Sequence, residues 1–204
     1  MQTDRGLDRL AFFTDAIAAI AITLLILPLV DLVPGFTGTP EHFLQRHLTE
    51  LGSFVLSFAV IARLWMAHHT LFEHVGSYSR TLRWLSLAWA FTIVLLPLPT
   101  AMVARWQPEA LIVGFYIGTM LLSSCLLTAM SVLVSRTPRL QQDGNPPTRD
   151  RVLSSVLSSA EFLVALVIGT LFRDINFFAL LLLFVSTPIL ALVRKRSSKV
   201  IAHA

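Results

Sequence analysis

The chain has 204 residues, of which 55% are hydrophobic and 14% are charged, and its mean hydropathy is +0.72. Soluble domains carry roughly a quarter charged residues, so this composition excludes a disordered chain, a nucleic-acid-binding domain and an ordinary soluble enzyme. The net charge is +4, but the basic residues lie between and after apolar blocks, which favours an anionic lipid surface over nucleic acid as the partner. The single cysteine, Cys125, excludes an intrachain disulfide.

Six apolar segments are long enough to cross a bilayer, which requires about 20 mostly apolar residues. The sequence therefore predicts an all-α polytopic membrane protein, with one domain over residues 1–204 built as a bundle of six transmembrane helices. The expected spans are 10–30, 51–74, 83–104, 110–134, 152–172 and 175–193. The first span follows two arginines, as a signal peptide does, but it is longer than such a peptide and contains Asp15, so we interpret it as a retained helix.

The positions of lysine and arginine predict the orientation, because cytoplasmic loops of membrane proteins are enriched in both. With the N-terminus in the cytoplasm, twelve basic residues lie on the inner side and three on the outer side. The inner residues are Arg5, Arg9, Arg80, Arg83, Arg136, Arg139, Arg149, Arg151, Arg194, Lys195, Arg196 and Lys199, the outer ones are Arg46, Arg105 and Arg173, and Arg63 lies within the second span. We therefore expect both termini to be cytoplasmic, in a multi-pass protein of the cell membrane.

The first span has two distinct faces when about 100° of rotation is assigned to each residue. Ile20, Thr23, Leu27 and Asp31 share one face, which offers an apolar stripe, one hydroxyl and a carboxylate at the outer end. Asp15 lies on the other side of the helix, near its inner end. The two faces therefore require different neighbours.

A carboxylate inside a span costs a few kcal/mol unless it is paired, so Asp15 is a candidate site. Arg9 lies about 120° away around the helix axis, so we expect Asp15 to meet a donor from another helix. Candidate partners at the same depth lie near the end of the second span and at the start of the third. They are Arg63, Trp65, His68, His69, Trp84 and Ser86. We interpret this network as a polar lock between helices, with a proton-sensing or gating group as the alternative.

Several short motifs occur between residues 9 and 100. They are Arg9 followed after three residues by Phe13-Thr14-Asp15, then Trp65-Met-Ala-His68-His69, Arg83-Trp84-Leu85, and Leu95-Leu96-Pro97-Leu98-Pro99-Thr100. This set resembles the lysosomal-type potassium channel family (the transmembrane protein 175 family), whose signature is Arg, three residues, then Phe-Ser-Asp. Thr14 keeps the hydroxyl of the usual serine, whereas Ser86 stands where family members often have asparagine. The single six-helix unit is similar to the prokaryotic members, which assemble as tetramers.

This resemblance implies a homotetrameric potassium channel in which helix one of each subunit lines the pore, with K⁺ as the permeant ion and no cofactor. The positions that match the family's constriction are Ile20, with Thr23 and Leu27 further outward, and no carbonyl selectivity filter is implied. The signature Arg9, Thr14 and Asp15 would belong to an interhelix hydrogen-bond network with Trp65, His68, His69, Trp84 and Ser86.

Elementary physics supports such a pore. One helix per chain cannot enclose a channel, so conduction along helix one requires a closed oligomeric ring. A narrow ring of Ile20 side chains would block ions by dewetting, because a partly dehydrated cation finds no replacement oxygen atoms there. Asp31 on the same face would concentrate cations at the outer mouth.

Three further features of the sequence bear on its function. Glu161 lies inside the fifth span and shares one face with Ser154 and Ser158; we expect its carboxylate to accept hydrogen bonds from these serines, with a proton or cation relay as the alternative. Gly114 and Gly118 form a G-x-x-x-G pattern that predicts a tight packing face.

The pattern of His69, Glu73 and His74 follows neither common zinc-protease order, so no metal site is predicted. No catalytic constellation is visible, and we do not expect an enzyme. The alternative function is a proton-coupled secondary transporter that uses the intramembrane carboxylates Asp15 and Glu161.

Overall fold

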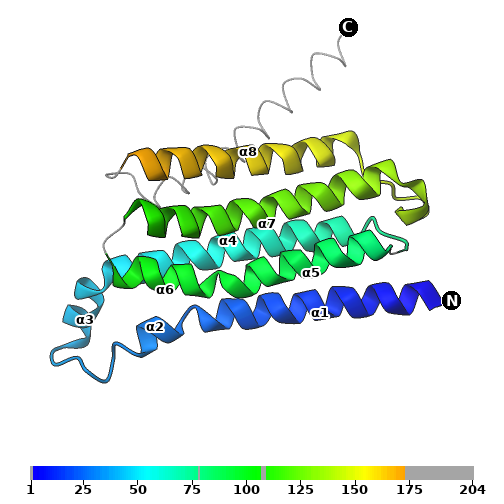
Figure 1. Ribbon diagram of the computed structural model, residues 1–204. Helices are drawn as coiled ribbons and strands as arrows, with labels where there is room; N and C mark the ends of the chain where they lie inside the picture. Colours follow the sequence, from blue (N-terminus) through cyan, green and yellow to red (C-terminus); the bar gives the residue numbers. More distant parts are fainter. Residues whose placement is uncertain (1, 78, 107–108, 173–204) are drawn as a thin grey trace, which may run out of the picture.

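The computed structural model describes residues 2–77, 79–106 and 109–172, and these form a bundle of long helices (Figure 1). Helix α1 (Gln2–Leu24) is followed by the short α2 (Leu27–Val30), and together they form the first span, Gly6–Val30. The break between them has a local cause. Pro28 has no N–H and its ring crowds the carbonyl of Leu24, four residues earlier.

The next two spans run antiparallel to one another. Helix α4 (Leu48–Phe72) forms the second span, and α5 (Arg80–Leu95) with α6 (Pro97–Arg105) forms the third. The third span is interrupted at Leu96 because Pro97 cannot donate an N–H to a preceding carbonyl. At its start, the hydroxyl of Ser79 accepts a hydrogen bond from the backbone N–H of Leu82 at 3.1 Å and caps α5.

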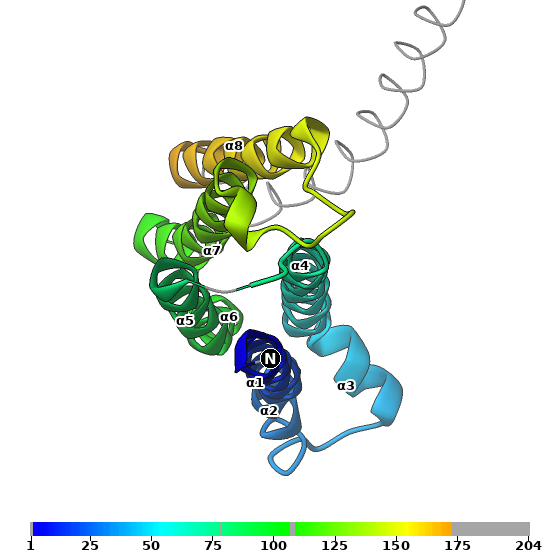
Figure 2. The same ribbon diagram turned by 90° about the vertical axis from the view of Figure 1, so that its right-hand side faces the viewer.

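Helix α7 (Ala110–Arg136) occupies a central position, with α5 on one side and α8 (Arg149–Leu171) on the other. Figure 1 shows α7 and α8 side by side along their length. The end-on view shows α1 near the opposite side of the bundle, between α4 and α5 (Figure 2). Helix α1 therefore packs on the bundle along one side only.

A short helix, α3 (Pro40–Arg46), lies in the loop between the first two spans. The side chain of Thr39 caps it by accepting a hydrogen bond from the N–H of His42 at 3.3 Å. At the other end of the bundle, the loop before α5 pairs with the loop after α7, which contains the 3₁₀ turn η1 (Pro138–Leu140). An antiparallel bridge joins Val75 to Gln141, so the two loops are held together there.

The interior of the bundle is built from fully buried apolar side chains. The largest of these are Trp89, Tyr116, Phe162, Ile61, Leu82, Ile93, Leu96, Ile117, Met120 and Met130. Many large apolar side chains remain on the outside of the helices, as expected for a chain whose surroundings are hydrocarbon or other subunits. Burial of the interior fixes which face of each helix points inward.

The described part of the chain confirms the predicted all-helical, multi-pass architecture. Five of its segments are long and apolar enough to cross a membrane, and each starts and ends within a few residues of a predicted span. The predicted sixth span, 175–193, lies outside the described residues.

Candidate pore-lining face of helix one

The first span, which consists of α1 and α2 and is called helix one below, faces the bundle with small and branched apolar residues. Leu10, Ala18, Ala21, Leu25 and Leu29 are buried and recur at helical spacing. The two alanines allow close approach to the neighbouring helices α4 and α5. One face of helix one is therefore committed to the bundle, and the opposite face is left open.

The open face carries the residues predicted to line a pore. Ile20 is 60% exposed and Leu27 is 49% exposed, and Thr23 and Asp31 are also exposed. Within the described chain, Ile20, Thr23 and Leu27 lie on a face of the first span that is open. Asp31 follows the break between α1 and α2, and it also lines a cavity with residues of α4 and α6.

The hydroxyl of Thr23 is oriented by its own helix. Its Oγ1 donates a hydrogen bond to the carbonyl oxygen of Ile20 at 2.7 Å. Because a hydroxyl has one proton and two lone pairs, the remaining capacity of Thr23 is that of an acceptor. One residue further along, the carbonyl of Leu24 loses its helical donor to Pro28. The hydroxyl of Thr23 and the carbonyl of Leu24 thus provide oxygen atoms on the C-terminal side of Ile20.

On its other side, Asp15 contacts helix α4. The indole Nε1 of Trp65 donates a hydrogen bond to Oδ1 of Asp15 at 2.8 Å. The Trp65 ring also lies against His69, with ring centroids 5.5 Å apart. Asp15 therefore accepts a hydrogen bond from another helix, and this contact connects helix one to α4.

Other members of the predicted network lie elsewhere. Thr14 is buried and its hydroxyl bonds back to the carbonyls of Leu10 and Ala11. Ser86 donates to the carbonyl of Leu82 and contacts the sulfur of Met130 at 3.3 Å.

His68 is buried between two aromatic rings, Trp89 at a centroid distance of 4.0 Å and Phe72 at 4.4 Å. Arg9 and Trp84 are exposed on the surface of the described chain. The structure therefore joins Asp15 directly to Trp65 and brings His69 beside that indole, but it does not gather the other predicted members around the carboxylate.

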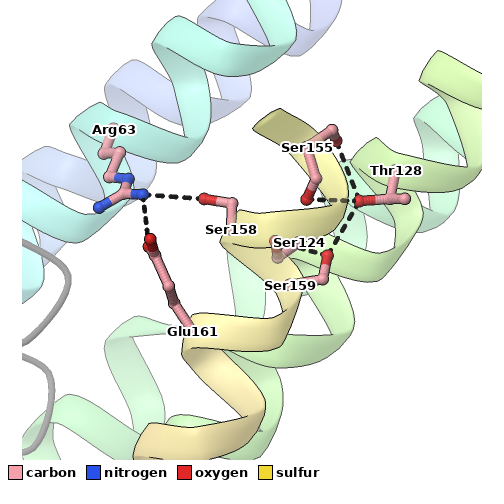
Figure 3. A network of polar contacts seen from close by, with 7 residues as sticks. All are labelled: Arg63, Ser124, Thr128, Ser155, Ser158, Ser159 and Glu161. Atoms are coloured by element: carbon pink, nitrogen blue, oxygen red, sulfur yellow. Dashed lines mark hydrogen bonds and ion pairs between the residues drawn. The ribbon is translucent and has the colours of Figure 1, made fainter. Parts of the chain in front are cut away.

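A second polar site lies inside the bundle, where α4 meets α8 (Figure 3). Nη2 of Arg63 donates to Oε2 of Glu161 at 3.0 Å and to the hydroxyl of Ser158 at 2.9 Å. We expected Glu161 to accept hydrogen bonds from serines. This prediction is wrong, because the carboxylate accepts a hydrogen bond from Arg63, whose guanidinium lies between Glu161 and Ser158. Ser154 instead donates to the carbonyl of Asp150 at 2.9 Å.

Two polar contacts between helices were not predicted. Arg63 was a candidate partner of Asp15, but it pairs with Glu161; an intramembrane arginine and an intramembrane glutamate in one chain are a signal of such a pair. Tyr116 was not considered at all; its hydroxyl lies 2.7 Å from that of Ser57, which also accepts a hydrogen bond from Thr100 at 3.1 Å. A tyrosine in a long apolar helix signals such a partner, because a buried phenol requires one.

Part of the chain is similar to proteins of one family. Residues 9–97 match the family model described as the endosomal/lysosomal potassium channel TMEM175. A potassium channel of Streptomyces collinus is 36% identical over 101 residues, which cover 50% of this chain and 49% of that protein. The endosomal/lysosomal proton channel TMEM175 of Rattus norvegicus is 29% identical over 125 residues, covering 61% of this chain and 24% of that protein.

A solved structure shares the fold. The lysosomal potassium-selective channel TMEM175 homolog from Chamaesiphon minutus superposes with a TM-score of 0.72 at 20% identity, covering 91% of this chain and 97% of that one. The matched region spans about half the length of the Streptomyces relative and about a quarter of the rat one. The signature at Arg9 to Asp15 lies inside the matched region, so residues 9–97 are similar to the TMEM175 family in sequence, and the described chain shares the fold of the Chamaesiphon homolog.

Proposed function

We propose that this chain forms a potassium-preferring channel of the cell membrane, in which four copies surround a pore lined by helix one. The observation that carries the proposal is the open face of helix one, on which Ile20, Thr23, Leu27 and Asp31 are all exposed. A single such helix cannot enclose a pore, and a cyclic ring of identical subunits brings the four faces together. The potassium channel names of bacterial relatives support this assignment.

In this proposal, Ile20 forms the constriction. Its side chain is 60% exposed in the described chain. A ring of such side chains around the axis excludes water when narrow, and an ion then loses its hydration shell without replacement. A modest widening that admits water would open the pore.

The oxygen atoms beyond Ile20 supply partial replacement for water. Thr23 has its proton engaged with the Ile20 carbonyl, so its lone pairs are available to a cation. Asp31 lies at the outer end of the same exposed face and raises the local concentration of cations there. Selectivity then arises from the width of the constriction and the cost of dehydration, and not from a filter of backbone carbonyls.

A proton-coupled transporter is the competing function, and the mammalian relatives named as proton channels give it weight. It would depend on Asp15 and Glu161. Both carboxylates have a donor in the structure, Trp65 for Asp15 and Arg63 for Glu161. Those partners support roles in holding helices together, and we therefore favour the potassium pore.

Reconstitution into liposomes under a potassium gradient tests the proposal. Single-channel current steps carried by K⁺ are expected, whereas slow saturating flux that depends on a proton gradient would favour the transporter. Replacing the apolar ring by amides in Ile20→Asn should ease hydration and raise the conductance or weaken selectivity. The matched control is Val55→Asn, which places the same amide on an exposed apolar position of α4. Equal currents in both variants and the wild type would remove Ile20 from the constriction.

A further inference from the structure

A second cavity lies away from helix one, between α4, α7 and α8, and has a volume of about 360 Å³. Its polar lining comes from all three helices. Arg63 lies in its wall beside Ser158, nine residues into α8, while Arg151 lies near the start of the same helix. The cavity therefore extends from the end of the bundle that carries most of the basic residues toward the middle of the span.

The charge of this lining is positive. Among the described residues, two guanidinium groups and no carboxylate side chain line the cavity. Arg63 is neutralised by Glu161 at 3.0 Å, but among the described residues Arg151 has no acidic partner. The hydrogen bond recorded for Arg151 runs from Nη1 to the carbonyl of Thr70 and is long, at 3.4 Å. A half-buried arginine is thus left without a counter-charge.

Hydroxyl groups complete the site. Ser131 of α7 lines the cavity and is only 6% exposed, yet within the described chain its hydroxyl has no hydrogen-bond partner. The hydroxyl belongs to the lining of the cavity, so it is available to donate to, or accept from, a ligand there. An anionic oxygen atom would satisfy both this hydroxyl and the guanidinium of Arg151.

The surroundings identify the class of anion. The positive-inside distribution places Arg151 at the cytoplasmic surface, where the membrane leaflet carries anionic lipids. The cavity also opens toward hydrocarbon, because Met66 in its wall is 56% exposed. A ligand that combines a phosphate with apolar chains matches both features, and basic pockets between membrane helices on this side are typical sites for such headgroups.

We propose that an anionic glycerophospholipid of the cytoplasmic leaflet binds between α4, α7 and α8, with its phosphate between Arg151 and the hydroxyl of Ser131. The lipid would supply the counter-charge that Arg151 lacks in the described chain and would connect the fifth span to α4. This site does not depend on which helix lines the pore.

Lipid titration of the purified full-length chain tests the proposal. The thermal stability of the protein in detergent is followed while phosphatidylglycerol, phosphatidylcholine or inorganic phosphate is added, and the apparent affinity is taken from the rise in Tm. The wild type is compared with Arg151→Gln. The control is Arg149→Gln, which removes the same charge from an exposed neighbour outside the cavity.

We expect phosphatidylglycerol to stabilise the wild type and Arg149→Gln equally, and the affinity of Arg151→Gln to fall roughly tenfold, the effect of losing a charged hydrogen bond. Ser131→Ala should weaken the binding of phosphatidylglycerol by a smaller factor. If Arg151→Gln does not fold, this variant provides the test instead. An equal loss in both arginine variants would overturn the site in favour of general surface attraction. Equal stabilisation by phosphatidylcholine, or by inorganic phosphate alone, would overturn the anionic lipid as the ligand.

Discussion

Trp65 of α4 donates its indole N–H to the carboxylate of Asp15 on helix one, at 2.8 Å. This contact lies on the side of helix one that faces away from Ile20, so the proposed pore face and the anchoring face of the helix are separate. A charged group within a membrane span is costly unless it is paired. The Trp65–Asp15 hydrogen bond therefore both reduces that cost and fixes the rotation of helix one about its axis.

The first prediction concerns this hydrogen bond. Trp65→Phe keeps an aromatic ring but removes the donor, and it should lower the free energy of unfolding by about 1–2 kcal/mol. Chemical or thermal unfolding in detergent measures the loss. Trp84→Phe is the matched control, because Trp84 is 62% exposed and no described residue accepts its indole N–H. Equal stability of the two variants would show that the contact does not anchor helix one.

Local periodicity predicted much of this arrangement. The spans follow from runs of apolar residues, and the separation of Ile20 from Asp15 follows from the helical repeat of about 100° per residue. Both depend only on residues close together in the chain. The short helix α3 likewise has a local cause, because Pro40 follows the capping residue Thr39.

Contacts between distant spans could not be predicted in the same way. Arg63 and Glu161 are 98 residues apart, and their pairing depends on α8 lying beside α4, which no local pattern specifies. The burial of His68 between Trp89 and Phe72 depends on how α5 packs against α4. From the residues themselves, the partners of Asp15 were predicted by their depth in the membrane. This criterion grouped side chains, such as Trp65 and His68, that point in different directions.

The second prediction concerns the Arg63–Glu161 pair. Glu161→Gln leaves a partly buried guanidinium without its carboxylate, and it should destabilise the protein by about 3 kcal/mol. The double variant Arg63→Met/Glu161→Leu removes both charges and should recover most of the loss. Unfolding of Arg63→Met, Glu161→Leu and the double variant provides a double-mutant cycle. Additive losses, with no recovery in the double variant, would contradict direct coupling of the two side chains.

The third prediction concerns Thr23. Thr23→Val keeps the shape of the side chain but removes the oxygen atom that follows Ile20 on the open face, so K⁺ conductance and discrimination against Na⁺ should both fall. Thr23→Ser restores a hydroxyl at the same place and should keep both properties near those of the wild type. Reversal potentials measured under mixed K⁺ and Na⁺ gradients in planar bilayers provide the comparison. Wild-type selectivity in Thr23→Val would exclude this hydroxyl from the permeation path.

The fourth prediction concerns the paired loops before α5 and after α7. A Cβ atom added to Gly76 would lie 2.7 Å from the backbone carbonyl oxygen of Gln141, and the N–H of Gly76 also donates to the carbonyl of Leu140 at 2.9 Å. Gly76→Ala must therefore separate the two loops, and we expect a loss of about 1–3 kcal/mol together with faster proteolysis there. A backbone atom cannot move aside as a flexible side chain can.

Gly118→Ala is the control for this substitution. The predicted tight packing face is absent at Gly118, because an added Cβ meets nothing within 4 Å; at Gly114 it would lie 3.6 Å from Thr170, an ordinary contact. Alanine at 118 should thus be neutral or stabilise α7 by up to about 1 kcal/mol through its helix propensity. If Gly76→Ala were as stable and as resistant to proteolysis as Gly118→Ala, the two loops would not be held in contact. If Gly118→Ala instead disrupted assembly, that glycine would lie against another subunit.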